Sequence, residues 1–339
     1  MMIAYPETEQ FRSVIEKITR NPSRYKIEHG KSFPVLKFIG TVKLHGTNAA
    51  IVYQKDFEHY CQSRNNIITP EMDNAGFARF MYSLAKRFLM EKVLPDCPVF
   101  RKHFECGNNI VIYGEWCGGN IQKNVAIQGL ARMFVIFKIR VGNSKAPLWL
   151  DPKEWSNLRW PEQSIFNIHD FPTYEIPIDF NQPKLSQNKL TEITEAVEQE
   201  CPVGAHFNRN GAGEGVVWTE WTQSRGLLTF KVKGKEHSVR KVSQLASVET
   251  EKFTSLFEFV EYACTENRMQ QAVDYLYEQQ LTIEMENVET FLRWLTADII
   301  KEESDTMNDS NINSKDVGCA ITDKATAWFQ DQLYLYVEQ

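Results

Sequence analysis

A lysine in the segment KLHGTN is the first residue that could do chemistry. Lys43 lies between two runs of apolar and β-branched residues, FIGTV and AAIVY, with a glycine turn between them. Burial beside apolar strands disfavours the ammonium form of lysine, and the neutral amine is a nucleophile. His45 and Asn48 belong to the same turn and could support the same ligand. A surface lysine entering a hairpin has the same local sequence, so this segment alone leaves both interpretations open.

Two glutamates stand beside glycines at the ends of strand-like runs. Glu115 follows Gly114 in VIYGEW, where a carboxylate at a strand end next to a flexible turn can reach a ligand. Glu214 is flanked by Gly213 and Gly215 in GEGVVW, and such glycines let a ligand or an ion approach the backbone closely. Its carboxylate is a candidate Mg²⁺ contact, directly or through water. An exposed carboxylate at a strand end or a bulge would give the same pattern.

Four further side chains could bind phosphate or a base. Alternation in LLTFKVKGK places Lys231 and Lys233 on one strand face, which suits a polyphosphate. Arg64, in CQSRNN, is a forked donor suited to phosphate. Phe137, in MFVIFKIRV, could stack on a base. Taken singly, an amphipathic surface strand explains the two lysines better, and core packing is the usual role of a phenylalanine in a strand.

A strand-rich region up to about residue 240 must position these groups. Short apolar and β-branched segments recur between Gly, Asn, Asp and Pro, as expected for strands and their connections. Two stretches, residues 77–94 and 189–200, have helical patterns, and the second follows a turn-like segment, residues 181–187.

The pattern changes after residue 245. Apolar residues recur there at helical spacing in three stretches: Met269, Ala272, Val273 and Leu276; Val288, Phe291, Leu292, Leu295 and Ile299; and Ala325, Trp328, Phe329, Leu333 and Tyr336. We therefore expect two domains, residues 1–245 and an all-α domain at 246–339. The polar and acidic residues 302–318 predict a mobile loop.

Composition and charge limit the class of protein. Hydrophobic residues make up 42% of the 339 residues and charged residues 24%, which is typical of a soluble globular protein and excludes a disordered or fibrous one. No apolar run of membrane-spanning length and no signal peptide is evident, so we expect no membrane association. Seven cysteines without a C-x-x-C pair indicate reduced thiols and a cytoplasmic location.

The charge is divided unevenly along the chain. Residues 1–145 have a net charge of +9, residues 146–245 of -2 and residues 246–339 of -13. A basic first part can bind a polyanion although the whole chain is acidic. Chance variation between solvated surfaces would give the same division, and charge alone does not separate the two. The few cations of the last part that could face a polyanion are Lys252, Arg268, Arg293, Lys301, Lys315 and Lys324.

Together and in this order, the motifs resemble those of the covalent nucleotidyltransferases, the superfamily of ligases and capping enzymes. The match spans residues 40–235, from KLHGTN to FKVK. K-x-H-G, where DNA ligases and capping enzymes have K-x-D-G, resembles the RNA ligases. The run G-x-x-I-Q-K-N-V after Glu115 resembles the bacteriophage nick-sealing enzymes of the RNA ligase 2 family, which includes trypanosome RNA-editing ligases. The C-terminal part is similar to that family only in length and helicity. No P-loop, Rossmann, H-E-x-x-H or G-x-S-x-G motif competes with this interpretation.

The resemblance implies a fold and a nucleotide site. The fold is α+β: an antiparallel-sheet nucleotidyltransferase domain, similar to the ATP-grasp-like ligases, followed by a small all-α domain. Lys43 is the lysine that becomes linked to AMP. His45 and Asn48 support the nucleotide, Arg64 contacts phosphate or ribose, and Glu115 holds the ribose.

The same resemblance assigns the remaining candidates. Phe137 stacks on adenine, Glu214 serves metal-assisted catalysis, and Lys231 and Lys233 grip the triphosphate. Lys138 departs from the pattern, because an acidic residue is expected there.

The implied reaction is ATP-dependent RNA ligation by a monomer with Mg²⁺ or Mn²⁺. A lysine–AMP forms, AMP passes to a 5′-phosphate RNA end, and a 3′-OH then displaces it, with nicks in duplex RNA as the expected substrate. One alternative is a non-catalytic RNA- or nucleotide-binding protein of the same fold, which would not need Lys43, Glu214 and the two strand lysines together. Another is a DNA ligase or a capping enzyme. His45 and the helical C-terminal part, in place of an OB-fold, disfavour both.

Overall fold

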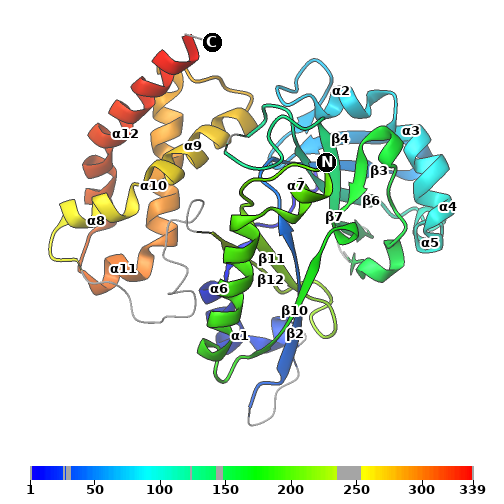
Figure 1. Ribbon diagram of the computed structural model, residues 1–339, viewed down its shortest axis with the longest axis horizontal. Coiled ribbons are helices and arrows are strands. Elements are labelled where there is room, and N and C mark those ends of the chain that lie inside the picture. Colours follow the sequence, from blue (N-terminus) through cyan, green and yellow to red (C-terminus); the bar gives the residue numbers. More distant parts are fainter. Residues whose placement is uncertain are drawn as a thin grey trace. The chain divides into compact units, whose positions relative to one another are not determined.

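The structure, a computed structural model, divides the chain into two compact units, residues 1–246 and 247–339 (Figure 1). The predicted boundary at residues 245 and 246 lies outside the described residues. None of the helices in the described parts of the chain is long and apolar enough to cross a membrane. The described residues are 2–25, 27, 32–122, 124–142, 148–234 and 253–337.

The first unit contains a five-stranded sheet in the order β1-β12-β11-β2-β10. Its neighbours are antiparallel except β1 and β12, which run parallel. Helices α1 (Phe11–Arg20) and α6 (Lys184–Gln199) pack against this sheet and bury its apolar face (Figure 1). The strands are β1 (Glu9–Gln10), β2 (Val35–Lys43), β10 (Thr173–Asp179), β11 (Gly215–Glu220) and β12 (Thr229–Lys233).

The second sheet has seven strands, in the order β5-β4-β3-β6-β7-β8, with β9 parallel to β7. Its strands are β3 (Thr47–Tyr53), β4 (His59–Ser63), β5 (Ile67–Ile68), β6 (Ile110–Cys117), β7 (Met133–Val141), β8 (Leu148–Trp149) and β9 (Ile165–Asn167). Four helices cover one face of this sheet (Figure 1): α2 (Phe77–Tyr82), α3 (Ala85–Phe88), α4 (Leu94–Asp96) and α5 (Pro98–Glu105).

The two faces of the second sheet follow the alternation of its residues. Ala49 and Ile51 of β3 pack with the helices, whereas Ala50 and Val52 lie on the opposite face. The N-terminal segment covers part of that opposite face, where the backbone of Ile3 is held by side chains of the sheet. The antiparallel-rich α+β architecture agrees with the predicted fold class.

Both helices predicted in the first unit exist, with different bounds. Residues 77–94 form α2, α3 and a π-helical turn, Leu89–Val93, instead of one helix. No Pro or Gly within this stretch marks the breaks. Helix α6 begins at Lys184, five residues earlier than predicted, because Pro183 precedes the first turn, where its missing N–H costs nothing. The prediction that residues 181–187 form a turn is therefore wrong in its second half.

The second unit is helical, as the periodicity predicted. The patterned residues from Met269 to Leu333 pack into one core, in which Leu276, Leu295 and Phe329 are fully buried. The side chain of Tyr336 lies outside the described ones. The helices are α8 (Leu256–Ala263), α9 (Glu266–Glu278), α10 (Val288–Glu302), α11 (Ser304–Asp309) and α12 (Ser314–Val337).

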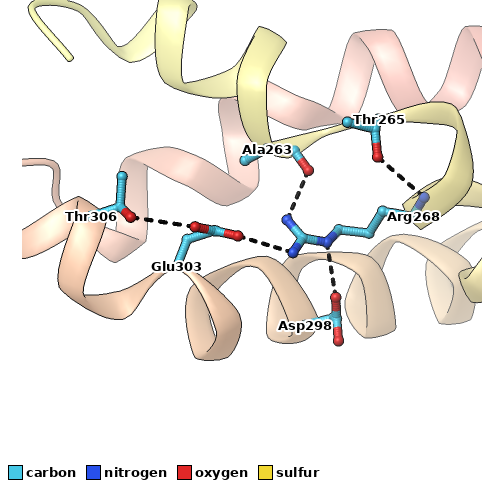
Figure 2. Close-up of polar contacts among 6 residues, drawn as sticks. All are labelled: Ala263, Thr265, Arg268, Asp298, Glu303 and Thr306. Atoms are coloured by element: carbon cyan, nitrogen blue, oxygen red, sulfur yellow. Dashed lines mark hydrogen bonds and ion pairs between the residues drawn. The ribbon is translucent and has the colours of Figure 1, made fainter. Parts of the chain in front are cut away.

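The prediction of a mobile loop at residues 302–318 is wrong, because α11 and the start of α12 lie there. Figure 2 shows the cause, a buried polar network around Arg268, which is 1% exposed. Its guanidinium donates to the Glu303 carboxylate at 3.1 Å and to the Ala263 carbonyl at 2.8 Å. It also pairs with Asp298 at 3.0 Å. A buried guanidinium needs such partners, so polar residues here stabilise packed helices.

Candidate active site

Three adjacent strands bring two of the predicted lysines to either side of one glycine. Gly215, the first residue of β11, pairs with Lys43 at the end of β2 and with Lys233 at the end of β12. Its φ of +146° is in a region that favours glycine, and a Cβ would lie 2.2 Å from the Val232 carbonyl oxygen. The backbone at this level of the sheet is therefore closely packed, which fixes the spacing of the two lysines.

Glu214 lies between these lysines and binds both. Its Oε2 is 2.5 Å from the Lys43 Nζ, and its Oε1 is 2.9 Å from the Lys233 Nζ. The His45 Nδ1 lies 3.5 Å from the same Oε2. Glu214 is 2% exposed, whereas the three cationic side chains keep 16–21% of their surface exposed. The cluster therefore has a buried carboxylate and an accessible basic side.

Electrostatics keep this carboxylate ionised. Burial by itself would raise the pKa of Glu214, but Lys233, Lys43 and His45 together hold that pKa well below its ordinary value. A carboxylate with so low a pKa is a poor acceptor for the Lys43 proton while the other cations stay beside it. Glu214 is thus suited to holding Lys43 and Lys233 in place. An anionic ligand that enters would compete with Glu214 for both lysines.

The second sheet presents two further candidates on the face opposite its helices. Asn48 in β3 pairs with Glu115 in β6, which pairs in turn with Val135 in β7. Asn48 is buried and Glu115 is partly exposed. Lys43 and Asn48 lie at the two ends of the turn that carries the chain from one sheet to the other, so the two groups of candidates are close along the chain.

Phe137 lies at a β-bulge. Tyr113 pairs with Lys138 and Gly114 pairs with Ile136, so Phe137 is the extra residue of β7. A bulge re-aims a side chain and is common beside functional sites. The ring of Phe137 is partly buried and meets the Tyr5 ring edge-on, with centroids 5.1 Å apart.

Tyr5 is a member of this site that the sequence did not indicate. Burial raises the pKa of Tyr5, and among the smaller effects the charge of Arg64 lowers it and that of Glu115 raises it. Arg64 follows the end of β4, which neighbours β3. Tyr5 stands in an N-terminal segment with no strand or helix periodicity, so no local signal distinguishes it from any exposed aromatic residue.

The structure thus groups the candidates into two sets. Lys43, His45 and Lys233 contact Glu214 directly. Asn48, Glu115 and Phe137 lie on the face of the second sheet opposite its helices, and Arg64 follows β4 of that sheet. Lys231 shares the face of Lys233 but pairs with Val217, two residues further from the strand end. In the described parts of the chain, no three His, Cys, Asp or Glu side chains form a cluster that could hold a metal ion.

Solved structures of a Naegleria gruberi RNA ligase are similar to this chain at low identity. A point mutant with ATP and Mn shares 19% identity with a TM-score of 0.42, covering 69% of this chain and 57% of that one. The same ligase with PPi shares 19% identity with a TM-score of 0.43, covering 69% and 56%. This chain therefore aligns with little more than half the length of those chains. No curated protein matches the chain.

A family profile covers the candidate site. The profile described as RNA ligase matches residues 36–233, more than half of the chain. These bounds run from β2, which carries Lys43, to the end of β12, which carries Lys231 and Lys233. On the strength of that match, the chain belongs to the RNA ligase family.

Proposed function

We propose that this protein is an ATP-dependent RNA ligase that works through a covalent Lys43–AMP. The observation that carries the proposal is the Lys43–Glu214–Lys233 cluster, in which a buried carboxylate holds two lysines at one level of a sheet. The Lys43 nitrogen attacks the α-phosphorus of ATP and pyrophosphate leaves. AMP then passes to a 5′-phosphate RNA end, and a 3′-OH displaces AMP to form the phosphodiester. The covalent intermediate divides one difficult displacement into easier ones.

The cluster supports the first step by electrostatics. The β- and γ-phosphates bring negative charge to the side of the cluster where the cations are exposed. Lys233 and Lys231 would bind them, and charge held in place before the reaction is worth most in a site with little water. Glu214 keeps Lys43 aimed at the α-phosphorus until the proton of Lys43 is lost to solvent.

The second set of residues would hold the nucleoside. Phe137 offers a partly buried ring for the adenine, and Glu115 a carboxylate for the ribose hydroxyls. Asn48 supports Glu115 from the adjacent strand, and Arg64 reaches a phosphate or the ribose. Glu115 and Arg64 both act electrostatically on Tyr5, which supports a single pocket for base and sugar.

A divalent metal fits this site only if the nucleotide supplies most of its ligands. The described residues offer no cage of three acidic or imidazole groups, and both oxygens of Glu214 already bind cations. Mg²⁺ in phosphate-transfer sites commonly takes one or two carboxylates and otherwise phosphate oxygens and water. Glu214 would contribute that carboxylate through an oxygen that becomes available when the nucleotide phosphates compete for its lysines. The metal would neutralise charge on the phosphates.

The substrate we propose is a nick in duplex RNA with a 3′-OH and a 5′-phosphate, sealed in the cytoplasm by a monomer. His45 in K-L-H-G and the helical second unit support the nick-sealing RNA ligases over DNA ligases and capping enzymes. The test compares ligation of nicked duplex RNA, nicked duplex DNA and single-stranded RNA ends of the same sequence. Nicked RNA should be sealed fastest. Equal or faster sealing of nicked DNA would contradict the RNA assignment, and no ligation at all would favour a binding protein.

The two strand lysines should differ in the step that they affect. Lys231→Ala should slow Lys–AMP formation by about 10²-fold and leave the sealing of a pre-adenylylated RNA end nearly unchanged, since that end has no β- or γ-phosphate. Lys233→Ala should slow both steps, because Lys233 also binds Glu214. Gel assays of each half-reaction measure this, with Lys189→Ala, an exposed α6 lysine, as the control. If Lys231→Ala slows the sealing of a pre-adenylylated end more than it slows Lys–AMP formation, the role of Lys231 in binding the β- and γ-phosphates is contradicted.

Removal of the helical unit should separate the two halves of the reaction. A protein that ends at residue 246 should form Lys–AMP at the full-length rate, because every proposed nucleotide contact lies before residue 235. The helical unit has its own core, so its removal cuts no sheet. The shortened protein should fail to seal nicked duplex RNA. Sealing at the full-length rate would show that the unit does not serve RNA binding.

The structure narrows the cations that this unit can offer to RNA. Arg268 is buried among Glu303 and Asp298, so its expected role on an RNA-facing surface is wrong. Arg293 and Lys324 are at least one-third exposed and pair with glutamates. Lys252 lies outside the described residues, and Lys301 and Lys315 are exposed lysines of α10 and α12.

A further inference from the structure

Lys138 is a buried lysine that joins the two sheets of the first unit. It lies in β7, beside Phe137, and only 4% of it is exposed. Its Nζ donates to the Gly226 carbonyl oxygen at 2.8 Å and to the Thr229 hydroxyl at 2.9 Å. Both acceptors belong to the β11–β12 hairpin of the five-stranded sheet, whereas β7 belongs to the seven-stranded one. Lys138 therefore bridges the sheet of Phe137 and the sheet of the strand lysines.

Aromatic rings surround the Lys138 ammonium. Its Nζ lies 4.7 Å from the ring centroid of Trp149, 5.5 Å from that of Trp221 and 5.9 Å from that of Tyr5. A cation within about 6 Å of an aromatic face is attracted to it, more strongly when water is excluded. None of the ion pairs between described residues includes Lys138. Rings and two hydrogen bonds thus take the place of a counter-ion.

The hairpin that receives Lys138 is itself braced. The Glu220 carboxylate accepts from three successive backbone N–H groups, those of residues 222–224, and the Glu220 carbonyl accepts from the Gly226 N–H at 2.8 Å. The Ser224 hydroxyl donates to the same carbonyl at 2.9 Å. Thr229 then begins β12, the strand of Lys231 and Lys233. Lys138 is therefore attached to a turn held by several hydrogen bonds, which leads directly into the strand of the proposed phosphate-binding lysines.

We propose that Lys138 is a positioning residue for nucleotide binding. It ties the β-bulge that carries Phe137 to the hairpin that leads to Lys231 and Lys233. A nucleotide spanning both sheets needs its base contact and its phosphate contacts at a fixed distance, and Lys138 sets that distance. This inference rests on the proposed function, since it assumes that the ligand touches both sheets. Lys138 itself touches no reacting atom in this account.

The protonation of Lys138 changes near neutrality. Burial lowers the pKa of Lys138 to about 7. The neutral amine keeps two N–H donors and so both hydrogen bonds, but it loses the attraction to the rings. The bridge should therefore weaken, without breaking, as pH rises through 7. The titratable or charged groups on the strands around it are Tyr113, Glu115 and Cys117 of β6, Arg140 of β7, Glu220 of β11, and Lys231 and Lys233 of β12. Tyr5 of the N-terminal segment and Arg225 of the hairpin are also nearby in the fold or the chain.

The first test separates affinity from chemistry. Lys138→Met keeps the length of the side chain but has no donor and no charge, so it should raise the KM for ATP in Lys–AMP formation about tenfold and leave kcat within about twofold. Lys138→Arg restores donors and charge and should recover most of the affinity. Lys153→Met, an exposed lysine of the same unit, is the control. An unchanged KM in Lys138→Met, or a loss confined to kcat, overturns the proposal.

The second test asks whether Lys138 acts through Phe137. Phe137→Ala should raise the KM for ATP, and the double variant with Lys138→Met should have a KM no more than about twice that of Phe137→Ala alone. If the two substitutions raise the KM for ATP by factors that multiply in the double variant, Lys138 acts independently of the base contact. If Phe137→Ala leaves KM unchanged, the base-stacking role in the proposed function has failed. The two failures are therefore distinguishable.

The pH profile adds a readout that a purely structural role would not change. The ratio of KM between Lys138→Met and the wild type should shrink as pH rises from about 6 to about 8, because the Lys138 ammonium, with its pKa of about 7, is present only in the wild type. A ratio that is constant over this range contradicts the role of the charge. Should Lys138→Met not fold, Thr229→Val removes one acceptor and must raise KM in the same direction, and a wild-type KM in Thr229→Val overturns the proposal.

Discussion

Lys43→Ala should abolish the covalent labelling of this protein by α-labelled ATP. Lys43 is the candidate nucleophile, and its Nζ is held 2.5 Å from Glu214 at the end of β2. No other lysine in direct contact with Glu214 can replace it, because Lys233 lies on the far side of Gly215, where the β- and γ-phosphates are proposed to bind. The measurement is a denaturing gel run after incubation with α-labelled ATP and Mg²⁺. The labelled band of Lys43→Ala should fall below the detection limit.

Two further variants make this result specific. Lys43→Arg keeps the positive charge and the pairing with Glu214, but a guanidinium is never neutral at this pH and should be equally inactive. Lys37→Ala removes an exposed lysine of the same strand, which pairs with Glu175 at the surface, and should label normally. A labelled band that survives in Lys43→Ala would assign the nucleophile to another residue.

Glu214→Gln should have the second largest effect. The amide keeps the shape of the side chain but removes the charge that holds both lysines, so Lys–AMP formation should fall by about 10²–10³-fold. Glu175→Gln, which breaks the exposed pair with Lys37, is the matched control and should label normally. Normal labelling in Glu214→Gln would show that Lys–AMP formation does not need the charge of this carboxylate.

The same variant should lose stability with a defined pH dependence. Breaking a buried ion pair costs about 3–5 kcal/mol, and the partial exposure of Lys43 and Lys233 places Glu214→Gln at or below the lower end. The pKa of Glu214 is lowered in the folded protein, so its stabilisation is fully present above about pH 4.3, the value of an unfolded glutamate, and is lost as pH falls towards the folded value. Urea unfolding of both proteins at pH 7 and pH 3 measures the difference, which should shrink at the lower pH. A difference that is the same at both pH values contradicts the ion-pair role.

Local sequence predicted those parts of the site that depend on neighbours along the chain. The turn after Lys43 and the alternation that places Lys231 and Lys233 on one face are properties of single segments, and the structure has both. The helical periodicity after residue 245 was equally local, and its apolar residues form the core of the second unit. Such patterns can be recognised from the sequence alone because each one depends on the residues of a single helix, strand or turn.

The remaining features depend on contacts between distant residues. Glu214 meets Lys43 only because β11 pairs with β2 across 171 positions of the chain. The bulge at Phe137 depends on the register between β6 and β7, and Tyr5 joins the site through packing alone. The helix at residues 304–309 is stabilised by a buried network with Arg268, 35 positions away from Glu303, which composition cannot reveal.

The most direct measurement of the central claim is the site of AMP attachment. Intact-protein mass spectrometry after incubation with ATP and Mg²⁺, followed by peptide mapping, should find one adenylyl group per chain, on Lys43. Added pyrophosphate should remove it, because the first step is reversible in the proposed mechanism, and the Lys37→Ala protein should behave identically. An adenylyl group on Lys231, Lys233 or any other residue, or none on a folded protein that binds ATP, would contradict the account.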